Sequence, residues 1–231
     1  TSNSEASCHM PKEAGVLSKP VLVCENVGDF SDYIVDGLNG IVISKSNTQQ
    51  ELKIKLMDVY EKRIDINKFN IRYPDANKSI PIICHTPSAT GAKGTIEVRK
   101  IMDRLKLNYS FEYVEITNKS HAEAIQAIEQ CDIYLDQFIL GAYGMAACEA
   151  MSMGKPVFCY IMQPVLDLLP TDCPILYKGL NELEEDLIEY INNSLMRNKT
   201  GKLSRVYMEK YHNVKIISSK LTTILEELVA L

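Results

Sequence analysis

A short turn in the middle of the chain has the residue types that bind phosphate. The sequence GAKGT at 91–95 places Lys93 between Gly91 and Gly94, just where a helix is expected to begin. Glycines let a ligand approach the backbone closely, and both a lysine and the amide groups of a helix N-terminus favour anions. Ser88 adds a hydroxyl donor before the turn. The alternative interpretation is a solvated helix start, because Gly-Lys-Gly turns are common on protein surfaces.

A second candidate is the carboxylate of Glu149, which stands in the apolar stretch ACEAMSM. An unpaired charge in such a helix is costly, so this carboxylate needs a partner. It can accept hydrogen bonds from two neighbouring hydroxyls, as on a ribose, or form a structural pair with a nearby cation. Gly144 and Met145 open the same helix, so that its first amide groups could face a phosphate.

One histidine has two open interpretations. His85 ends the apolar run SIPIICH, at the end of an expected strand. Its ring either points into a crevice beyond the strand or lies in the core with both nitrogens hydrogen-bonded. The sequence favours neither interpretation.

The elements that must position these residues alternate between strands and helices. Apolar runs predict strands at 79–85, 111–116, 132–135, 156–161 and 174–177. Capping patterns predict a helix after Ser120-x-x-Glu123 and another after Asn181-x-x-Glu184, and a run rich in Ala and Met predicts a helix over 144–153. Apolar residues at helical spacing predict three helical faces: Val98, Ile101, Met102 and Leu105; Leu183, Leu187, Ile188, Ile191 and Leu195, in the helix after Asn181; and Leu221, Ile224, Leu225 and Leu228. Such alternation is typical of a parallel sheet covered on both faces. We therefore predict an α/β fold, with a Rossmann-like doubly wound parallel sheet over 66–231.

Residues 1–65 repeat part of this pattern. EAGVLSKPV at 13–21 lies over EAMSMGKPV at 149–157, with Glu, Ala, Lys, Pro and Val in register. Both copies then run strand, linker, short strand and capped helix, and the first such helix begins near Thr48-x-x-Glu51. Matches in one window can arise by chance, but the shared order of elements favours a duplication. We predict that 1–65 form a partial α/β segment.

Composition argues against several classes of protein. The chain has 231 residues, 46% apolar and 24% charged, as in an ordinary globular protein, and its net charge of −5 argues against a nucleic-acid partner. No apolar run is long enough to span a bilayer, and the N-terminal residues lack a secretory signal pattern. Seven cysteines without a CxxC pattern indicate buried free thiols of a reducing compartment. We expect a cytoplasmic protein, with the inner membrane surface as an alternative location, and no metal site.

Three blocks resemble glycosyltransferases of the GT-B fold: HTPSATGAKGT at 85–95, SHAEAIQAIEQCDIYLDQ at 120–137 and GAYGMAACEAMSMGKPV at 141–157. The segment EAMSMGKPV resembles the EAMAxGxPV signature of the large retaining family often called GT4. The blocks occur in the family's order, and the resemblance covers residues 65–215. The N-terminal copy, from Met10 to Ile43, resembles the end of another such domain.

The resemblance implies a donor site for a nucleoside-diphosphate sugar. It places the diphosphate at Ser88, Gly91, Lys93, Gly94, Gly144 and Met145, the ribose at Glu149, and the base at Asn118 and Lys119. No cofactor is implied, because the nucleotide sugar itself is the donor substrate.

The sequence departs from the family at two points. The glutamate that contacts the sugar in the family is replaced by Gly141, with Tyr143 nearby. The Gly-Arg that holds the diphosphate is replaced by HTPS at 85–88. From their position before the loop, we expect Asp136 and Gln137 to take over part of the sugar contact.

The resemblance implies a glycosyltransferase, or its donor-binding portion, that transfers sugar with retention to a glycan or lipid acceptor in polysaccharide biosynthesis. Nothing in the sequence resembles an acceptor domain, which a separate domain or chain would then supply. We therefore expect the chain alone to bind donor but to transfer sugar slowly or not at all. The alternative is a non-catalytic nucleotide-sugar-binding or scaffold module. A sugar-nucleotide epimerase is a weaker third interpretation. A hydrolase is poorly supported, because the sequence contains no GxSxG motif.

Overall fold

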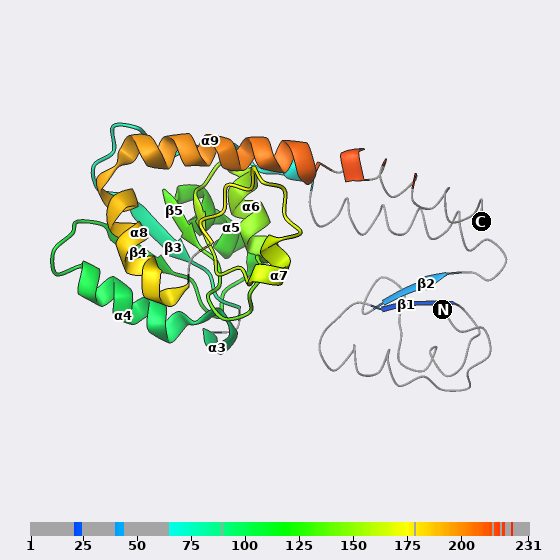
Figure 1. The fold of residues 1–231 in the computed structure, drawn as a ribbon, viewed down its shortest axis with the longest axis horizontal. Helices are drawn as coiled ribbons and strands as arrows, with labels where there is room; N and C mark the ends of the chain where they lie inside the picture. The colour runs from blue at the N-terminus through cyan, green and yellow to red at the C-terminus, as the bar shows by residue number, and fades with distance from the viewer. Residues whose placement is uncertain are drawn as a thin grey trace. The chain divides into compact units, whose positions relative to one another are not determined.

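The computed structural model describes two short strands, Val21–Cys24 and Gly40–Ile43, and residues 65–88, 90–177, 179–213, 215–217, 219 and 223 (Figure 1). The chain divides into two compact units, residues 1–63 with 217–231 and residues 64–216, and each is described by itself. The helix predicted near Thr48 and the final helix predicted at Leu221, Ile224, Leu225 and Leu228 lie outside the described residues.

In the first unit, β1 (Val21–Cys24) pairs in parallel with β2 (Gly40–Ile43), and Val21 lies opposite Gly40. The second copy of the repeat has a related pairing, in which Phe158 forms a parallel bridge with Leu176. Each copy thus contains a parallel pairing, and the duplication stays a prediction from the sequence.

The described part of the second unit contains a four-stranded parallel sheet. Its strands are β3 (Ile82–His85), β4 (Glu112–Glu115), β5 (Ile133–Leu135) and β6 (Val157–Phe158), in the spatial order β4-β3-β5-β6. The chain passes from β3 outward to β4 and then returns to the other side of β3 with β5, so the strand order reverses between β3 and β5. The sheet confirms the Rossmann-like parallel arrangement predicted from the alternation of elements.

The strands are shorter than the apolar runs that predict them. The run 156–161 contributes only two residues to β6. Residues 174–177, predicted as a further strand, contribute a single bridge, in which Leu176 donates to the carbonyl of Val157 over 2.9 Å. The prediction of a strand there is wrong. The pairing stops after one bridge because Pro174 has no amide hydrogen with which to extend the ladder.

The helices of this unit lie between and after the strands. They are the 3-10 helix η2 (Ile66–Lys68) and the α-helices α3 (Thr90–Lys93), α4 (Thr95–Leu105), α5 (His121–Gln130), α6 (Met145–Ser152), α7 (Gln163–Leu166), α8 (Leu180–Asn192) and α9 (Ser194–Tyr211). The predicted apolar face of α4 is buried at Val98, Ile101, Met102 and Leu105. The predicted capping box of α5 is also confirmed, with Ser120 as the N-cap.

The start and end of α8 differ from the prediction. Gly179, not Asn181, is the N-cap, and Asn181 lies within the first turn. The helix ends at Asn192, because the extended backbone of Asn193 begins α9 with a side-chain cap on the amide of Met196. Leu195 therefore lies outside α8 and is 70% exposed, and Leu183, Leu187, Tyr190 and Ile191 form the buried face instead.

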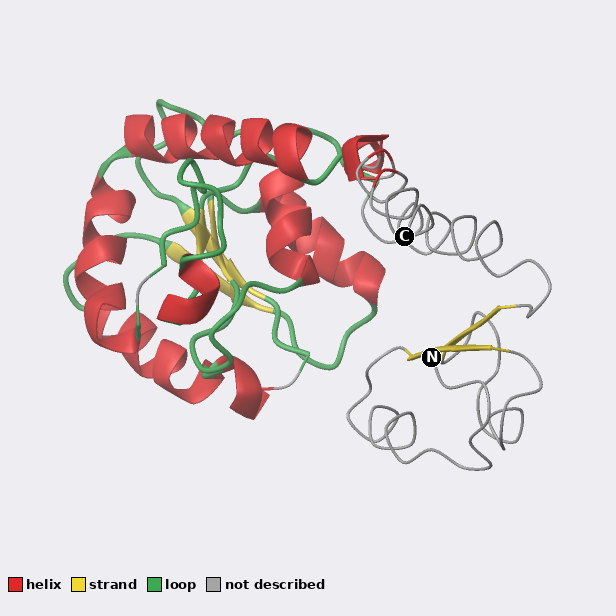
Figure 2. Cartoon of the chain, turned by 45° about the vertical axis from the view of Figure 1, so that its right-hand side comes forward, coloured by secondary structure: helices red, strands yellow, loops and turns green. Residues whose placement is uncertain are grey.

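Two apolar cores lie on opposite faces of the sheet. Side chains alternate along β3, so that Ile83 packs with residues of α4 and α8, whereas Cys84 packs with residues of α5, α6 and α9. Leu135 and Tyr134 of β5 alternate in the same way. Figure 2 shows the resulting layers, with helices on both sides of the strands. Helices thus cover both faces of the sheet, so a ligand can reach the sheet only at the ends of its strands.

Helix α9 is hydrogen-bonded to the first segment of the unit, residues 66–78. Side chains of α9 donate hydrogen bonds to main-chain carbonyls of residues 66–78: Ser194 to Ala76, Arg197 to Lys78, Asn198 to Pro74 and Arg205 to Ile66. Arg205 also donates to the carbonyl of Ser152, at the end of α6, over 2.8 Å. Both arginines are buried, so α9 fixes the segment that leads toward β3 together with α6.

The cysteine side chains that the structure describes are free thiols. Cys84, Cys131, Cys148 and Cys159 are buried, as predicted, and Cys173 is half-buried. Burial raises the pKa of the Cys148 thiol to about 12, so this group stays protonated and unreactive near neutral pH. In the described part of the chain, no helix combines the length and apolarity needed to cross a membrane.

Candidate functional site

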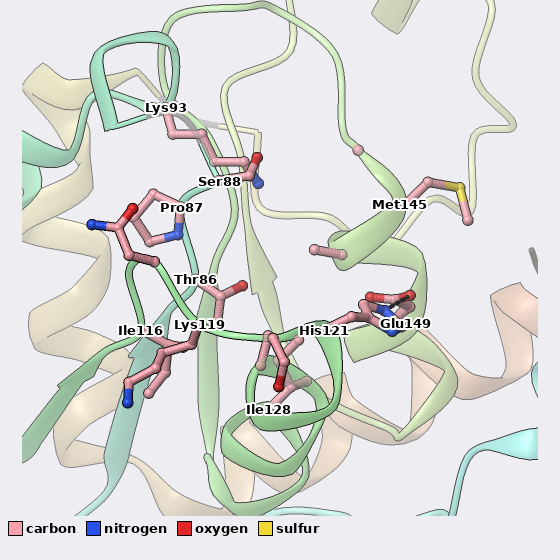
Figure 3. A pocket seen from close by; sticks show the side chains of 15 residues that line it. Thr86, Pro87, Ser88, Lys93, Ile116, Lys119, His121, Ile128, Met145 and Glu149 are labelled. Atoms are coloured by element: carbon pink, nitrogen blue, oxygen red, sulfur yellow. Dashed lines mark hydrogen bonds and ion pairs between the residues drawn. The ribbon is translucent and has the colours of Figure 1, made fainter. Parts of the chain in front are cut away.

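A cavity of about 590 Å³ opens at the carboxyl end of the sheet (Figure 3). Its walls are the residues after β3, Lys93 of α3, the loop after β4 with the first turns of α5, and the first turns of α6. The lining residues are Thr86, Pro87, Ser88, Lys93, Ile116, Asn118, Lys119, Ser120, His121, Ala124, Ile128, Gly144, Met145, Ala146 and Glu149. The cavity lies where the strand order reverses, which is where open α/β sheets bind ligands.

Lys93 supplies a cation at one wall of the cavity. It is the last residue of α3, and its side chain is 13% exposed. Its ammonium lies 2.6 Å from Oδ1 of Asp136. Gly94 follows at φ 72°, a left-handed conformation that favours glycine, and separates α3 from α4. The sequence GAKGT thus forms the turn that places Lys93 at the cavity.

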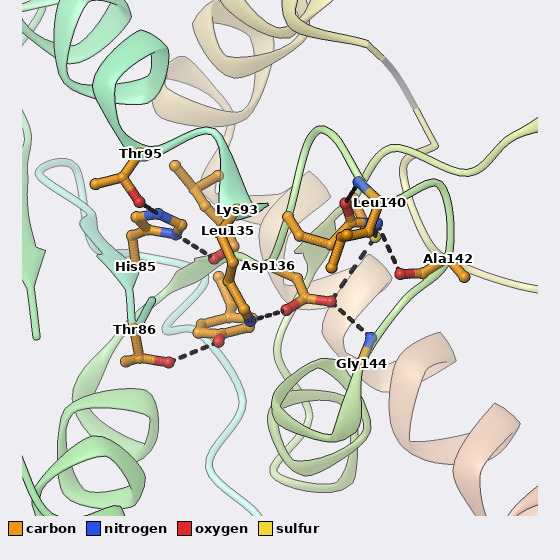
Figure 4. A network of polar contacts seen from close by, with 12 residues as sticks. His85, Thr86, Lys93, Thr95, Leu135, Asp136, Leu140, Ala142 and Gly144 are labelled. Carbon is orange, nitrogen blue, oxygen red and sulfur yellow. Dashed lines mark hydrogen bonds and ion pairs between the residues drawn. The ribbon is translucent and has the colours of Figure 1, made fainter. Parts of the chain in front are cut away.

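Asp136 joins two walls of the cavity without lining it. Its carboxylate is fully buried directly after β5. Oδ1 accepts a hydrogen bond from Lys93, and Oδ2 accepts one from the amide of Gly144 over 2.8 Å (Figure 4). The residue expected to contact the sugar therefore has protein donors on both of its oxygens.

The N-terminus of α6 brings free amide groups to the cavity. Gly144 is the N-cap, and its carbonyl accepts a hydrogen bond from the amide of Cys148. The amides of Met145, Ala146 and Ala147 have no acceptor among the described residues, as is usual for the start of a helix. Because Met145 and Ala146 line the cavity, this helix end offers partial positive charge to an anion there.

Glu149 has a structural partner and still lines the cavity. Its side chain is 10% exposed, and its Oε1 accepts a hydrogen bond from Nε2 of His121 over 2.8 Å. His121 is the first residue of α5, and its side chain is 72% exposed. No other described residue donates to the Glu149 carboxylate. Oε2 is therefore available to hydroxyl groups of a ligand.

His85 is a core histidine. Its ring is fully buried, with Nδ1 2.9 Å from the carbonyl of Leu135 and Nε2 3.0 Å from Oγ1 of Thr95. A carbonyl only accepts, so Nδ1 carries the hydrogen, and the neutral ring accepts from Thr95 at Nε2. Burial lowers the pKa of His85, with the nearby Lys93 acting in the same direction. Of the two interpretations left open by the sequence, the satisfied core histidine is correct.

The proposed base-binding residues lie on the wall opposite α6. Asn118 and Lys119 follow β4 and line the cavity. Asn118 has a φ of 54°, a left-handed conformation that asparagine tolerates better than most residues. Lys119 lies 3.4 Å from Glu123 and is 57% exposed. This loop therefore combines an amide side chain and a solvated cation at the cavity rim.

Both glycines of the GAKGT turn lie outside the cavity lining. Gly91 is exposed, and a Cβ added there would meet no atom within 4 Å. A Cβ added to Gly94 would lie 3.4 Å from Phe138 and Ile139. These glycines shape the turn, while Ser88 and Lys93 reach the cavity.

The loop after β5 also stays outside the cavity lining, apart from Gly144. Gln137 is buried and donates to the carbonyls of Ala142 and Tyr160, which folds the loop back on itself. Gly141 has a φ of 79° and packs against Met162. Tyr143 bonds the ring of His212 over 3.3 Å. Gln137, Gly141 and Tyr143, which the sequence places at the sugar, thus do not line the cavity.

Thr86 and His121 are polar lining residues to which the sequence assigned no role in the site. Thr86 bonds the hydroxyl of Tyr134 over 2.7 Å, and His121 bonds Glu149. The capping box at Ser120 could have identified His121, because it places residue 121 at the first turn of a helix beside the sheet. Among the residues that the structure describes, no group of three or more His, Cys, Asp or Glu side chains could hold a metal ion.

No family model and no curated protein matches this chain, but solved structures do. A mutant of S. aureus TarM in complex with fondaparinux, alpha-GlcNAc-glycerol and UDP has a TM-score of 0.52 at 12% identity, over 93% of this chain and 58% of that chain. A second TarM structure has a TM-score of 0.53 at 12% identity, over 94% of this chain and 45% of that chain. WaaG, a glycosyltransferase involved in lipopolysaccharide biosynthesis, has a TM-score of 0.49 at 12% identity, over 88% of this chain and 62% of that chain.

The chain thus spans about half the length of the TarM chains it matches. At this identity the similarity concerns the fold, and it agrees with the parallel sheet and the helices on both of its faces. The chain therefore has the Rossmann-like α/β fold of a GT-B glycosyltransferase domain.

Proposed function

We propose that this chain is the donor-binding portion of a glycosyltransferase that uses a nucleoside-diphosphate sugar. The observation that carries the proposal is one cavity with three kinds of group: the cation of Lys93, the free amides of α6 and the carboxylate of Glu149. A nucleotide sugar has matching parts, namely a diphosphate and a ribose with two neighbouring hydroxyls. The volume of about 590 Å³ is in the range of small-molecule sites.

The diphosphate is proposed to lie between Lys93 and the N-terminus of α6. The ammonium attracts one phosphate, and the amides of Met145 and Ala146 donate to the other. Ser88 adds a hydroxyl on the same wall. In a transfer reaction these groups would stabilise the negative charge that develops on the leaving diphosphate.

The nucleoside is proposed to lie toward α5. Glu149 accepts from the ribose hydroxyls, while the hydrogen bond from His121 holds its carboxylate in place. The base then extends toward Asn118 and Lys119, on the wall of the cavity opposite α6. UDP is the first nucleotide to test, because it is the one present in the TarM complex.

Retention, a glycan or lipid acceptor and a role in polysaccharide biosynthesis are proposed from the sequence resemblance. Contacts to the acceptor are proposed to come from a further domain or chain. Holding donor and acceptor together can supply roughly 7–11 kcal/mol of barrier lowering, so this chain alone should transfer sugar slowly. Release of nucleoside diphosphate from UDP- and GDP-sugars, with and without sugar and lipid acceptors, tests this part of the proposal. Acceptor-dependent turnover of about 1 per second or more would contradict it.

A non-catalytic nucleotide-sugar-binding module is the second candidate. It is favoured by Gly141, which stands where the family has its sugar-contacting glutamate and whose φ of 79° suits glycine. The pairing of Lys93 with Asp136 also leaves less net charge for a phosphate than a free lysine would. Binding of donor without hydrolysis or transfer under any acceptor condition would support this candidate.

Calorimetry with UDP and GDP tests the binding site directly. Lys93→Ala and Glu149→Ala should each weaken binding by about tenfold or more, because each removes a charged hydrogen-bonding partner of the ligand. Lys100→Ala and Glu184→Ala are matched controls, because these residues form exposed ion pairs outside the cavity. Equal affinity in the wild type and both cavity variants would contradict the proposed site.

A further inference from the structure

The buried carboxylate of Asp136 connects the two groups proposed to bind the diphosphate. Oδ1 lies 2.6 Å from the ammonium of Lys93, and Oδ2 lies 2.8 Å from the amide nitrogen of Gly144. The thiol of Cys159 approaches Oδ2 at 3.8 Å. Because protein donors occupy both oxygens and the residue does not line the cavity, direct contact with a sugar is not open to Asp136.

Lys93 depends on this carboxylate for its position. Among the described residues, Asp136 is the only side chain that pairs with its ammonium. Lys93 ends a helix of four residues and is followed by Gly94, so its own element restrains it weakly. A lysine stem is flexible and loses considerable rotamer entropy when it is fixed. Without Asp136, the ammonium would turn away from the buried wall toward solvent.

The same carboxylate also bonds the first residue of the α6 N-terminus. Gly144 is the N-cap of α6, and its amide points to Asp136 rather than to the cavity. The next amides, those of Met145 and Ala146, are the ones left for a ligand. One side chain thus fixes both the cation and the helix end that would meet neighbouring phosphates.

We propose that Asp136 is a positioning residue of the donor site, which holds the ammonium of Lys93 and the first turn of α6 at a fixed separation that fits a diphosphate. The proposal rests on the proposed function. A diphosphate contacts both groups at once, whereas a monophosphate contacts one of them. Loss of Asp136 should therefore weaken the binding of a nucleoside diphosphate more than the binding of a nucleoside monophosphate.

Asp132 provides a matched control at the opposite end of β5. Its carboxylate is 2.5 Å from the ammonium of Lys78 and 2.8 Å from the amide nitrogen of Ile82. It is nearly buried, and it does not line the cavity. Asp136→Asn and Asp132→Asn each remove the negative charge from a buried carboxylate that bonds one lysine and one backbone amide. A merely structural role predicts similar results for the two variants.

The experiment compares thermal stability and affinity for UDP and UMP in the wild type, Asp136→Asn and Asp132→Asn. Both variants should lose stability, because each weakens a buried ion pair. Only Asp136→Asn should lose UDP affinity, by about tenfold or more, with a smaller loss for UMP. Asp136→Asn with UDP affinity within about twofold of the wild type, or an equal loss in Asp132→Asn, would overturn the proposal.

A double-mutant cycle with Lys93→Ala tests whether Asp136 acts through the lysine. Lys93→Ala leaves the buried carboxylate unpaired, so adding Asp136→Asn should restore part of the lost stability. In that background, Asp136→Asn should also weaken UDP binding by much less than it does in the wild type. Equal losses of affinity in both backgrounds would contradict an action through Lys93.

Amine labelling separates the role of Asp136 from the proposed function. In the ligand-free protein, an acylating reagent should modify Lys93 slowly, because its ammonium is paired and its side chain is 13% exposed. Asp136→Asn should speed this labelling severalfold, whereas Asp132→Asn should not. Unchanged labelling of Lys93 would overturn the positioning role. If the wild type binds neither UDP nor GDP, the proposed function fails, and the labelling result still decides whether Asp136 positions Lys93.

Discussion

Replacing Gly201 with alanine tests the packing of α9 against the end of α6. Gly201 lies inside α9 and is buried where the helix passes Gly154, which has a φ of 78°. A Cβ at position 201 would come closer than 3.0 Å to the carbonyl oxygen of Gly154 and would lie 3.0 Å from Cδ of Pro74. The first of these contacts is with backbone, which cannot rotate away as a flexible side chain can.

Two opposing effects decide the size of the change. Alanine in place of glycine favours a helix by about 0.5–1 kcal/mol. Overpacking of a tight contact costs roughly 1–3 kcal/mol, and the upper part of this range applies because α9 or the Gly154 turn must shift. The expected net result is a loss of about 1–2 kcal/mol in the free energy of unfolding.

Urea unfolding followed by far-ultraviolet circular dichroism measures this change. Gly91→Ala is the matched control, because Gly91 also lies in a helix but an added Cβ there meets no atom within 4 Å. The control should equal or slightly exceed the wild type in stability. A Gly201→Ala protein that is as stable as Gly91→Ala would refute the reasoning.

Three further predictions concern other parts of the unit. Burial lowers the pKa of His85 from 6.5, so the unfolded state takes up the proton first and the free energy of unfolding falls as pH drops below 6.5. His85→Asn should make the free energy of unfolding, measured in urea, less dependent on pH in this range, and an unchanged pH dependence would contradict a neutral, buried His85. Gly141→Glu, which introduces the family's glutamate, should cost about 1–3 kcal/mol because of the positive φ and the contact with Met162; a stable variant with new turnover of UDP-sugar would show that the loop accepts it. Ser120→Ala removes the N-cap of α5 and should cost about 1 kcal/mol in the same unfolding assay, and no change would mean that Glu123 alone caps the helix.

Local patterns predict elements well where side chains and backbone agree. Val98 and Leu105 fall on one helical face, and the capping box at Ser120 uses neighbours within one turn, so both could be found from the sequence. The start of α8 could not be found in this way. Asn181 also fits a capping pattern, but the extended backbone of Gly179 begins the helix earlier. Competing polar residues near a helix start are separated only by backbone conformation.

The candidate site was predictable to the extent that it follows from strand order. Ser88, Asn118 and Glu149 meet at one cavity because each follows a parallel strand at the same end of the sheet. The pairing of Lys93 with Asp136 joins residues 43 positions apart and depends on how the end of α3 meets the residues after β5. No local spacing encodes such a contact, and for this reason the sequence led to a sugar contact for Asp136.

The bonds from α9 to residues 66–78 bear on how this protein tolerates sequence change. Ser194, Arg197, Asn198 and Arg205 donate to main-chain carbonyls, which every amino acid possesses. Residues 66–78 can therefore diverge at their exposed side chains while the path of the backbone stays fixed. The four donors in α9 cannot diverge so freely. Loss of either buried arginine, for example, leaves several carbonyls without a hydrogen-bond partner. Relatives of this chain should vary more in the segment that is held than in the helix that holds it.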